Sequence, residues 1–448
     1  MPQMQQRRAQ LQQELNRTDA VTPGIGPGLL KHQKMAMNPF RFLRGSSGLF
    51  YADISNSVLK LPEQLTAKIP LTTVIGDCHL ANFGFFTEEG SSGDRVIFAP
   101  NDFDDACIGH AVWDWSRFAV SVLLAADYCQ GVKQQRFSND EELDLDSLQV
   151  VTAKDAVAAV RSFLTAYTAQ CQAILAEPEL RYAVLDDFPK NHVLKPVLKK
   201  AIKRSAKGED FLRKSTLAKV ADLTSRPLRF KDDPVKFSRL TPELYQQVEF
   251  AFRPYVSDDI LDIVSRQGAG TGSLNMQRYY LLVGPADIRH QDDLALCHLI
   301  EAKQQRDSAP LYFFPDLSPV NRLNAAHLTV DCQRLMQRRP DLVLDEHYWQ
   351  GVHYLVRSLH HANVDVDPED VCFAEKAPGA ELAEYAEACG RTLALCHSRG
   401  DRRSLRFEQA VVQYLPQATD ALVQACVDYA EQQKTDCDLL AQLLTTAS

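Results

Sequence analysis

An acidic cluster set between apolar residues constrains this chain more than any other feature. It lies in IGDCHLANFGFF, residues 75–86, where Asp77, His79 and Asn82 follow one another at spacings of two and three beside two glycines. The preceding run, PLTTVI, has the length and composition of a strand. A carboxylate in a loop after a strand can accept a proton from a hydroxyl nucleophile, so Asp77 is a candidate general base.

A second acidic cluster follows the next apolar run, RVIFA, after a turn-like segment, TEEGSSGD. It contains Asp102, Asp104 and Asp105. An Asn from the first loop and an Asp from the second can hold Mg²⁺ through hard oxygen atoms. We therefore predict Asn82 and Asp102 as metal ligands, with Asp104 in reserve. One carboxylate for the nucleophile and oxygen ligands for metal are what phosphoryl transfer requires.

The bulk composition is that of a globular protein of 448 residues, which is long enough for two domains. The net charge of -9 argues against a nucleic-acid binder. The sequence lacks an apolar run of about 18 residues, so no membrane span is expected. The polar N-terminus predicts a helix in a cytoplasmic protein. Eleven scattered cysteines without a CxxC pair predict reduced, buried thiols rather than disulfides or zinc.

The apolar pattern predicts how the elements follow one another. Residues 1–65 are predicted as mostly helical around a loop, and the polar stretch 180–250 as a linker or a helical insertion. The remaining predictions are helices at 108–130, 152–177, 321–338 and from 380 onward, and strands within 266–284, 295–303 and 353–359.

Candidate nucleotide-binding parts lie downstream of the acidic clusters. In GTGSLNMQRYYLLV, the turn at Gly270, Gly272 and Ser273 would let backbone amides approach a phosphate. The strand LCHLIEAK ends in Lys303, which could meet the α and β phosphates. The helix NAAHLTVDCQRLMQRR offers only Asp331 as a carboxylate partner for that lysine.

Arg44, in the segment FLRGS, has two possible roles. It could bind a phosphate, or it could be a buried structural arginine.

The first motif resembles the catalytic loop of the kinase-like superfamily of small-molecule phosphotransferases, which includes the aminoglycoside and choline kinases. The resemblance implies that Asp102, in the Asp-Phe pair, binds metal and that Asp114 anchors the loop. His79 remains a candidate catalytic residue or metal ligand, but the resemblance favours a bracing role for it and leaves Asp77 as the base.

The order of the motifs differs from that of ordinary kinase-like chains. The segment LALCHSRGD resembles the helix that runs into the catalytic loop, yet it stands near the C-terminus. We therefore predict an α+β, kinase-like two-lobe fold in circularly permuted order. Residues 1–250 would form a helix-rich catalytic lobe, residues 251–375 a smaller antiparallel nucleotide-binding lobe, and residues 376–448 a helical tail that returns to the catalytic lobe.

Long motifs from NPFRFLRGSSGLFYADI to LALCHSRGD also occur in the order seen in an uncharacterised bacterial family, domain of unknown function 2252. The resemblance extends from about residue 30 to 402, with a divergent stretch between about 130 and 250. Where that family's turn carries a third glycine, this chain has Asn275, which tolerates a left-handed backbone better than most residues.

These observations leave several functions open. The first is an ATP- and Mg²⁺-dependent phosphotransferase acting on a hydroxyl of a small molecule or a protein, and a variant is nucleotidyl transfer by the same residues. The second is a nucleotide-binding pseudoenzyme that acts as a sensor or scaffold. A third is a metal-dependent hydrolase using His79 with the acidic cluster.

Overall fold

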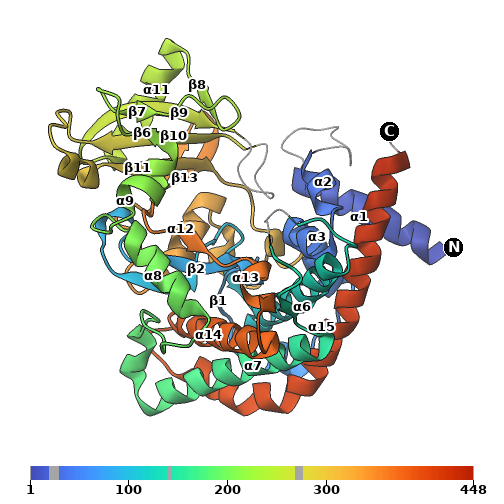
Figure 1. Ribbon diagram of the computed structural model, residues 1–448. Helices are drawn as coiled ribbons and strands as arrows, with labels where there is room; N and C mark the ends of the chain where they lie inside the picture. Colours follow the sequence, from blue (N-terminus) through green and yellow to red (C-terminus); the bar gives the residue numbers. More distant parts are fainter. Residues whose placement is uncertain (1, 20–29, 140–142, 268–275, 447–448) are drawn as a thin grey trace.

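The computed structural model describes residues 2–19, 30–139, 143–267 and 276–446. Helices fill one part of the molecule, and a six-stranded sheet forms most of another (Figure 1). Every strand pair in the described ranges is antiparallel. The predicted α+β class is therefore confirmed. We refer to the two parts as the helical region and the sheet region.

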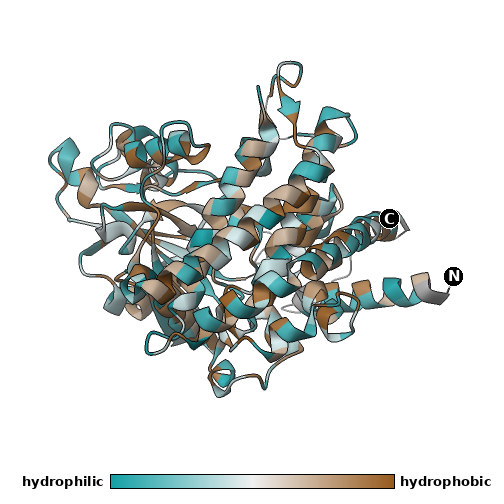
Figure 2. Cartoon of the chain, turned by 90° about the horizontal axis from the view of Figure 1, so that it is seen from below, coloured by the Kyte–Doolittle hydropathy of each residue, from teal (hydrophilic) through white to brown (hydrophobic). Residues whose placement is uncertain are grey.

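Four long helices build the helical region. Their apolar residues meet in one core. Figure 2 shows hydrophobic and polar residues side by side along helices of the molecule. Helix α7 begins with a capping box in which Thr152 and Asp155 satisfy each other's backbone amides. The four helices are α6 (Ala111–Lys133), α7 (Ala153–Ala176), α14 (Pro378–Ser398) and α15 (Arg406–Thr446).

Short helices near the N-terminus lie along α15, so that the two ends of the chain come together (Figure 1). Leu11 and Leu15 pack there with Leu440 and Leu443. These helices are α1 (Pro2–Asp19), α2 (Leu30–Met35), α3 (Pro39–Gly45), α4 (Ser47–Ser55) and α5 (Glu63–Ala67).

Small strands carry the two acidic clusters across the helical region. Strand β1 pairs with β4, and β2 pairs with both β3 and β14. Their bounds are β1 (Thr72–Val74), β2 (Phe83–Thr87), β3 (Val96–Pro100), β4 (Cys107–Gly109) and β14 (Val364–Asp365). Two further short strands, β5 (Gln149–Val150) and β15 (Phe373–Ala374), pair beside helix α13 (Pro368–Cys372).

The six-stranded sheet has the order β12-β13-β11-β10-β9-β8. Because side chains alternate along a strand, one face packs against helix α11 (Pro242–Phe252) through Phe252, Tyr279 and Val356. The opposite face carries Glu301, Lys303 and Arg357. The strands are β8 (Phe237–Arg239), β9 (Asp259–Arg266), β10 (Arg278–Gly284), β11 (His298–Gln304), β12 (Asp345–Trp349) and β13 (Val352–Leu359).

The stretch 180–250 contributes to both regions. Helix α8 packs on the helical core through Leu194 and Leu198, whereas Phe211 and Phe230 pack beneath the sheet. Its elements are α8 (Leu194–Arg204), α9 (Phe211–Lys214), α10 (Thr216–Val220), β6 (Ala221–Asp222) and β7 (Arg229–Phe230), followed by β8 and α11 of the sheet region.

Helix α12 (Ala325–Met336) connects the two regions. Its residue Cys332 is part of the helical core, and Val330 packs against Leu355 of β13. All eleven cysteines are buried and none is in a disulfide, as predicted. No helix in the described ranges is long and apolar enough to cross a membrane.

Candidate functional site

The loop after β1 is held by a buried carboxylate of α6. Asp114 accepts hydrogen bonds from the backbone amides of Ile75 (2.7 Å) and Gly76 (3.0 Å), and His397 Nε2 lies 3.0 Å from Oδ2, the oxygen that also accepts from Ile75. Gly76 has a φ of +79°, and an added Cβ would lie 1.9 Å from the carbonyl oxygen of Asp105. Asp114 therefore anchors this loop, the role that the resemblance to kinase-like chains implied for it.

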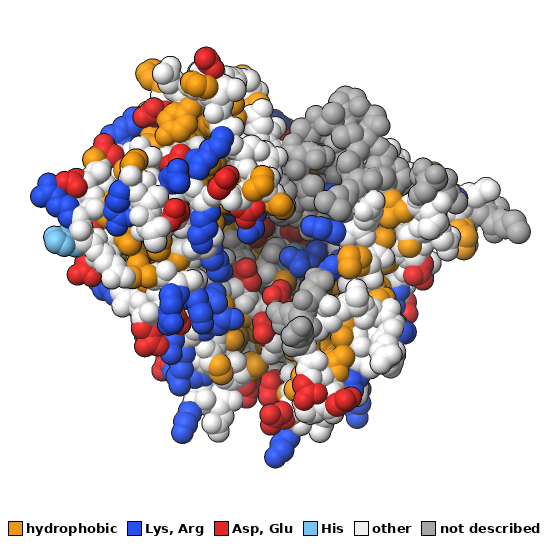
Figure 3. Space-filling model, turned by 45° about the horizontal axis from the view of Figure 1, so that its top comes forward, with side chains coloured by type: hydrophobic (Ala, Val, Ile, Leu, Met, Phe, Trp, Pro, Cys, Tyr) orange, Lys and Arg blue, Asp and Glu red, His pale blue; other side chains and the backbone are white. Residues whose placement is uncertain are grey.

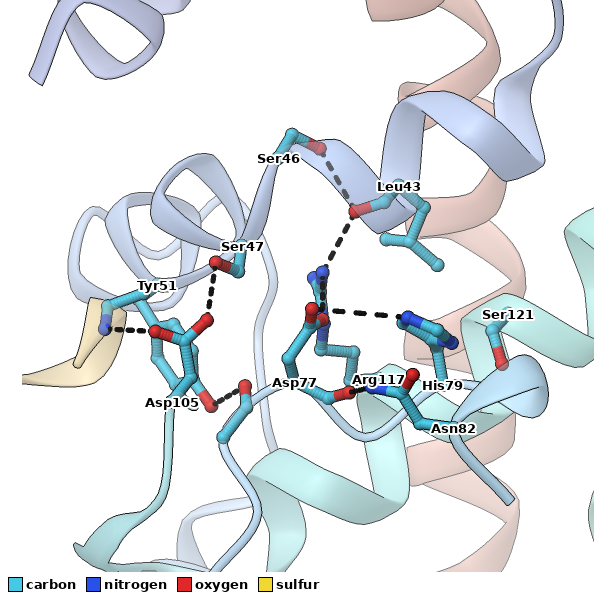
Figure 4. A network of polar contacts seen from close by, with 12 residues as sticks. Leu43, Ser46, Ser47, Tyr51, Asp77, His79, Asn82, Asp105, Arg117 and Ser121 are labelled. Atoms are coloured by element: carbon cyan, nitrogen blue, oxygen red, sulfur yellow. Dashed lines mark hydrogen bonds and ion pairs between the residues drawn. The ribbon is translucent and has the colours of Figure 1, made fainter. Parts of the chain in front are cut away.

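Asp77 is fixed by an arginine from α6 (Figure 4). Arg117 Nε donates to Asp77 Oδ1 over 2.5 Å, and a terminal nitrogen of Arg117 donates to the carbonyl of Leu43. Arg117 is fully buried, whereas the Asp77 side chain keeps 23% of its surface exposed. Burial raises the pKa of Asp77 to about 6, against the opposing effect of Arg117. The carboxylate is thus oriented and still accessible.

His79 lies beside Asp77, with its Nε2 atom 3.9 Å from Asp77 Oδ2. The ring is buried. Burial lowers the pKa of His79 well below its usual value, and the nearby cations Arg44 and Arg117 lower it further. The imidazole is therefore neutral near pH 7.

Asn82 and Asp102 lie at the ends of the two loops. The Asn82 side-chain nitrogen donates to the backbone carbonyl of Asp77 over 2.7 Å, so the amide oxygen is the atom left for a ligand. Asp102 Oδ1 accepts from the backbone amide of Asp104 over 3.2 Å. Within the described ranges, no group of three or more His, Cys, Asp or Glu side chains is placed to hold a metal. An ion bound by Asn82 and Asp102 would need other oxygen ligands, such as phosphates and water.

Lys303 reaches the second acidic loop from the sheet. Its Nζ atom forms an ion pair with Asp104, and Gln305 Nε2 donates to the other carboxylate oxygen over 3.2 Å. Burial lowers the pKa of Lys303 to about 7, and the neighbouring charge of Asp102 only partly offsets this effect. The sheet and the acidic loop therefore meet at this lysine, 199 positions from Asp104 along the chain.

The neighbouring acid, Asp105, is fully engaged by the protein. Arg306 binds both of its oxygens, at 2.8 and 3.0 Å, and Ser47 Oγ and the Ala309 amide also donate to it. Burial alone would raise the pKa of Asp105, but Arg306 and these hydrogen bonds hold it below its usual value. Asp105 joins chain segments and leaves no oxygen free for a metal.

A row of charged residues crosses the sheet next to Lys303. The carboxylate of Glu301 is buried and lies 3.2 Å from Arg278 on β10 and 2.8 Å from Arg357 on β13. Arg357 also lines a pocket of about 270 Å³ with Arg44, Asn82 and Asp102. Between the sheet and helical regions, Figure 3 shows a hollow in which acidic and basic side chains gather.

A family match now adds to this geometry. The family described as "Uncharacterized protein conserved in bacteria (DUF2252)" matches residues 28–139 and 147–443. The chain belongs to this family. The match continues through the stretch 147–250, where fewer motifs were recognised, and into α15. No curated protein and no solved structure matched the chain.

In this DUF2252 protein, the predicted site residues fall into two groups. The catalytic-loop and metal candidates Asp77, His79, Asn82, Asp102 and Asp104 lie in the two loops of the helical region, and Lys303 and Arg44 face the same area. The predicted phosphate-binding turn, comprising Gly270, Gly272, Ser273 and Asn275, lies outside the described residues. It falls in the segment that joins the antiparallel neighbours β9 and β10.

Asp331 is not the partner of Lys303. It lies 3.2 Å from His327 one turn earlier on α12, and Lys303 pairs with Asp104 instead.

The sequence prediction missed three charged residues of the DUF2252 site: Arg117, Glu301 and Arg357. The sequence contained a signal, in the form of spacing to a predicted residue, for two of them. Arg117 lies three positions after Asp114, which places both on one helix face, and Glu301 precedes Lys303 by two, which places both on one strand face. Arg357 had none, because an arginine in a strand most often faces solvent.

The C-terminal end of α14 lies against the start of β1. Thr72 Oγ1 donates to the carbonyl of His397 over 2.7 Å. An added Cβ on Gly400 would lie 2.4 Å from Thr72 Oγ1 and 2.9 Å from Thr73 Oγ1. The helix therefore ends where the loop-bearing strand of this DUF2252 protein begins.

Proposed function

We propose that this protein transfers a phosphoryl group from ATP, with Mg²⁺, to a hydroxyl group of an acceptor. The observation that carries the proposal is the ion pair between Lys303 and Asp104, beside Asp102. It brings the one buried lysine of β11 to the two loops that hold Asp77 and Asn82. Phosphoryl transfer requires a cation for the phosphates, oxygen ligands for metal and an oriented carboxylate in one place.

The residues present fit a Mg²⁺–nucleotide complex. Mg²⁺ commonly binds through one or two carboxylates together with substrate phosphates and water. Asn82, whose amide nitrogen is tied to the Asp77 carbonyl, would offer its oxygen, and Asp102 would offer a carboxylate. The bound metal would neutralise charge on the phosphates, which is its usual contribution to this chemistry.

Asp77 would orient the acceptor hydroxyl and accept its proton. Arg117 holds one carboxylate oxygen, so the group cannot rotate freely. Its pKa of about 6 leaves the carboxylate mostly ionised near neutral pH, yet makes it a better base than an exposed aspartate. His79, neutral and buried, would support the loop rather than act on the substrate.

Lys303 would bind the phosphates of the nucleotide. In the ligand-free site its ammonium group is held by Asp104. An incoming phosphate chain would compete for that ammonium group, and its negative charge would favour the protonated lysine. Arg44, which lines the pocket with Asn82 and Asp102, would be a second cation for the phosphates.

We further propose that the fold is kinase-like and circularly permuted. Support comes from the contact between the end of α14 and the start of β1. A chain joined there would run from α14 into the loop of Asp77 without a long connection. The sheet region would then precede α14, as a nucleotide-binding lobe precedes the catalytic loop in ordinary kinase-like chains.

The test uses the full-length protein with Mg²⁺ and ATP labelled on either the α or the γ phosphate, offered to small-molecule and protein extracts. The proposal expects γ-label on the acceptor. Transfer of α-label would instead establish nucleotidyl transfer by the same residues. Binding of ATP without transfer of either label would favour the pseudoenzyme hypothesis. An Asp102→Asn variant serves as the control, because the amide keeps the hydrogen bond from Asp104 but removes the charge.

A further inference from the structure

Arg357 is a positively charged residue of the pocket. Neither the catalytic-loop motif nor the lysine motif gives it a role. We propose that it binds the phosphate chain of the nucleotide directly, as a second phosphate ligand on the sheet beside Lys303. This inference rests on the proposed function, and it names the ligand as a polyphosphate.

The contacts of Arg357 leave its terminal nitrogens available. Its Nε donates to Glu301 Oε2 over 2.8 Å, and no other hydrogen bond from its guanidinium is found within the described ranges. The side chain retains 21% of its surface and lines the same pocket as Asn82 and Asp102. A guanidinium fixed at Nε presents its two terminal groups as a planar fork, which suits bidentate binding of a phosphate.

Two carboxylates act on Arg357. Glu301 is flanked by Arg278 and Arg357 across neighbouring strands. Burial lowers the pKa of Arg357, and the charges of Glu301 and Asp102 raise it. If Asp102 binds Mg²⁺, as the proposed function has it, the metal takes up the charge of Asp102, and a phosphate of the nucleotide would become a counter-ion for Arg357.

Two further acids of the pocket, Asp341 and Asp365, are bound by other donors. Asp341 accepts hydrogen bonds from the Val343 amide and from both the amide and hydroxyl of Ser358. Asp365 accepts from Asn101 over 2.8 Å. Both carboxylates therefore have donors of their own, and no direct ion pair joins either of them to Arg357 in the described ranges.

The matched pair of variants is Arg357→Met and Arg278→Met. Each removes one of the two cations on Glu301, but only Arg357 lines the pocket. Isothermal titration calorimetry of the full-length protein would measure the affinities for Mg²⁺–ATP, inorganic tripolyphosphate and adenosine, after thermal melting has shown that each variant is folded. The loss of a charge-assisted hydrogen bond worth about 1.5–3 kcal/mol corresponds to about ten- to hundredfold weaker binding.

We expect Arg357→Met to weaken ATP and tripolyphosphate binding by about tenfold or more and to leave adenosine binding within about twofold. Arg278→Met should change all three by less than about threefold. Equal weakening by both variants would mean that Arg357 acts through Glu301, and it would overturn the inference. Equal weakening of adenosine, or no weakening at all, would overturn it as well.

The tripolyphosphate titration separates the two proposals. If tripolyphosphate binds in an Arg357-dependent manner but ATP is not bound or no phosphoryl group is transferred, the proposed function fails and the phosphate site stands. If ATP binds and γ-label is transferred regardless of Arg357, the function stands and the phosphate site fails. If the wild-type protein binds neither probe, both are rejected.

Discussion

Two buried clusters of charge lie in different parts of this molecule, and a pocket borders each of them. The first joins the two ends of the chain. All three guanidinium nitrogens of Arg7 are hydrogen-bonded to Asp53, Asp436 or Gln10, and Tyr429 donates to Asp53 over 2.7 Å. Both carboxylates are fully buried. The guanidinium of Arg7 therefore has no N–H group left for a ligand.

The second cluster is the one between the sheet and the acidic loops. Among the residues that the structure describes, the guanidinium of Arg357 forms a hydrogen bond through one of its three nitrogens, and the side chain of Asn82 forms one through its amide nitrogen. Asp77 is oriented on one side and exposed on the other. The difference teaches that burial and charge alone do not mark a binding site. Polar atoms left unused beside a pocket do so, and the predictions below test that distinction.

The largest effect is expected from Asp77→Asn. The amide cannot accept a proton from the acceptor, so phosphoryl transfer should fall by about 10²- to 10⁴-fold. Nucleotide affinity should stay within about twofold, because the proposed function assigns Asp77 to the acceptor rather than to the phosphates. The measurements are initial rates with γ-labelled ATP and calorimetric binding of Mg²⁺–ATP. Unchanged turnover would exclude Asp77 as the base.

The next effect concerns the cluster at the chain ends. Arg7→Met leaves Asp53 and Asp436 buried without a cation, which typically costs about 3–5 kcal/mol of unfolding free energy. Denaturant titration would measure this loss. The activity of the molecules that remain folded should be unchanged, because Arg7, Asp53 and Asp436 belong neither to the acidic loops nor to the residues that line the pocket of Asn82 and Asp102. A stable but inactive variant would contradict the distinction between the clusters.

Much of this fold could be predicted from local patterns in the sequence. Helices α6 and α7 match the expected ranges because apolar residues recur at one period and Thr152 caps α7. Strands β11 and β13 were expected because short apolar runs end in polar residues. The two acidic loops were expected to contribute to one metal site, and the pairing of β2, which follows the first loop, with β3, which precedes the second, brings them side by side.

Other parts depend on how distant segments meet, and sequence patterns do not encode this directly. The sequence offered Asp331 on helix α12 as the carboxylate partner of Lys303. The acidic loop approaches the sheet closely enough for Asp104 to form that ion pair instead. The stretch 180–250 has weak apolar periodicity because its few apolar residues, such as Leu198 and Phe230, serve two different cores. The position of Arg357 next to Glu301 depends on the pairing of β13 with β11, which the sequence pattern does not specify.

A smaller effect is expected from pH. Asp77 must be ionised to accept a proton, so kcat/KM should fall about tenfold per pH unit below its pKa of about 6. Lys303 must be protonated to attract phosphate, so kcat/KM should also fall above its pKa of about 7. The expected profile is a narrow bell.

Lys303→Arg tests the alkaline side of that profile. Arginine remains charged throughout this range, so the loss of kcat/KM at high pH should disappear even if the maximum is lower. An unchanged alkaline limb in this variant would assign it to another group. If kcat/KM of the Asp77→Asn variant still rose with pH on the acid side, that limb would be assigned to a group other than Asp77.

The smallest effect is expected from an ion pair that belongs to neither cluster. Arg161 on α7 lies 2.6 Å from Asp420 on α15, and their side chains are 47% and 89% exposed. Water solvates both charges after the pair is broken, so Arg161→Gln should change the unfolding free energy by less than about 1 kcal/mol and leave activity unaltered. The loss should shrink further in high salt, which screens exposed charges. Denaturant titration at two salt concentrations would measure both. If Arg161→Gln lost as much stability as Arg7→Met, burial would not explain why removing Arg7 is destabilising. The contrast between a cluster whose polar atoms are all bonded and one with unused polar atoms would then rest on ligand binding alone.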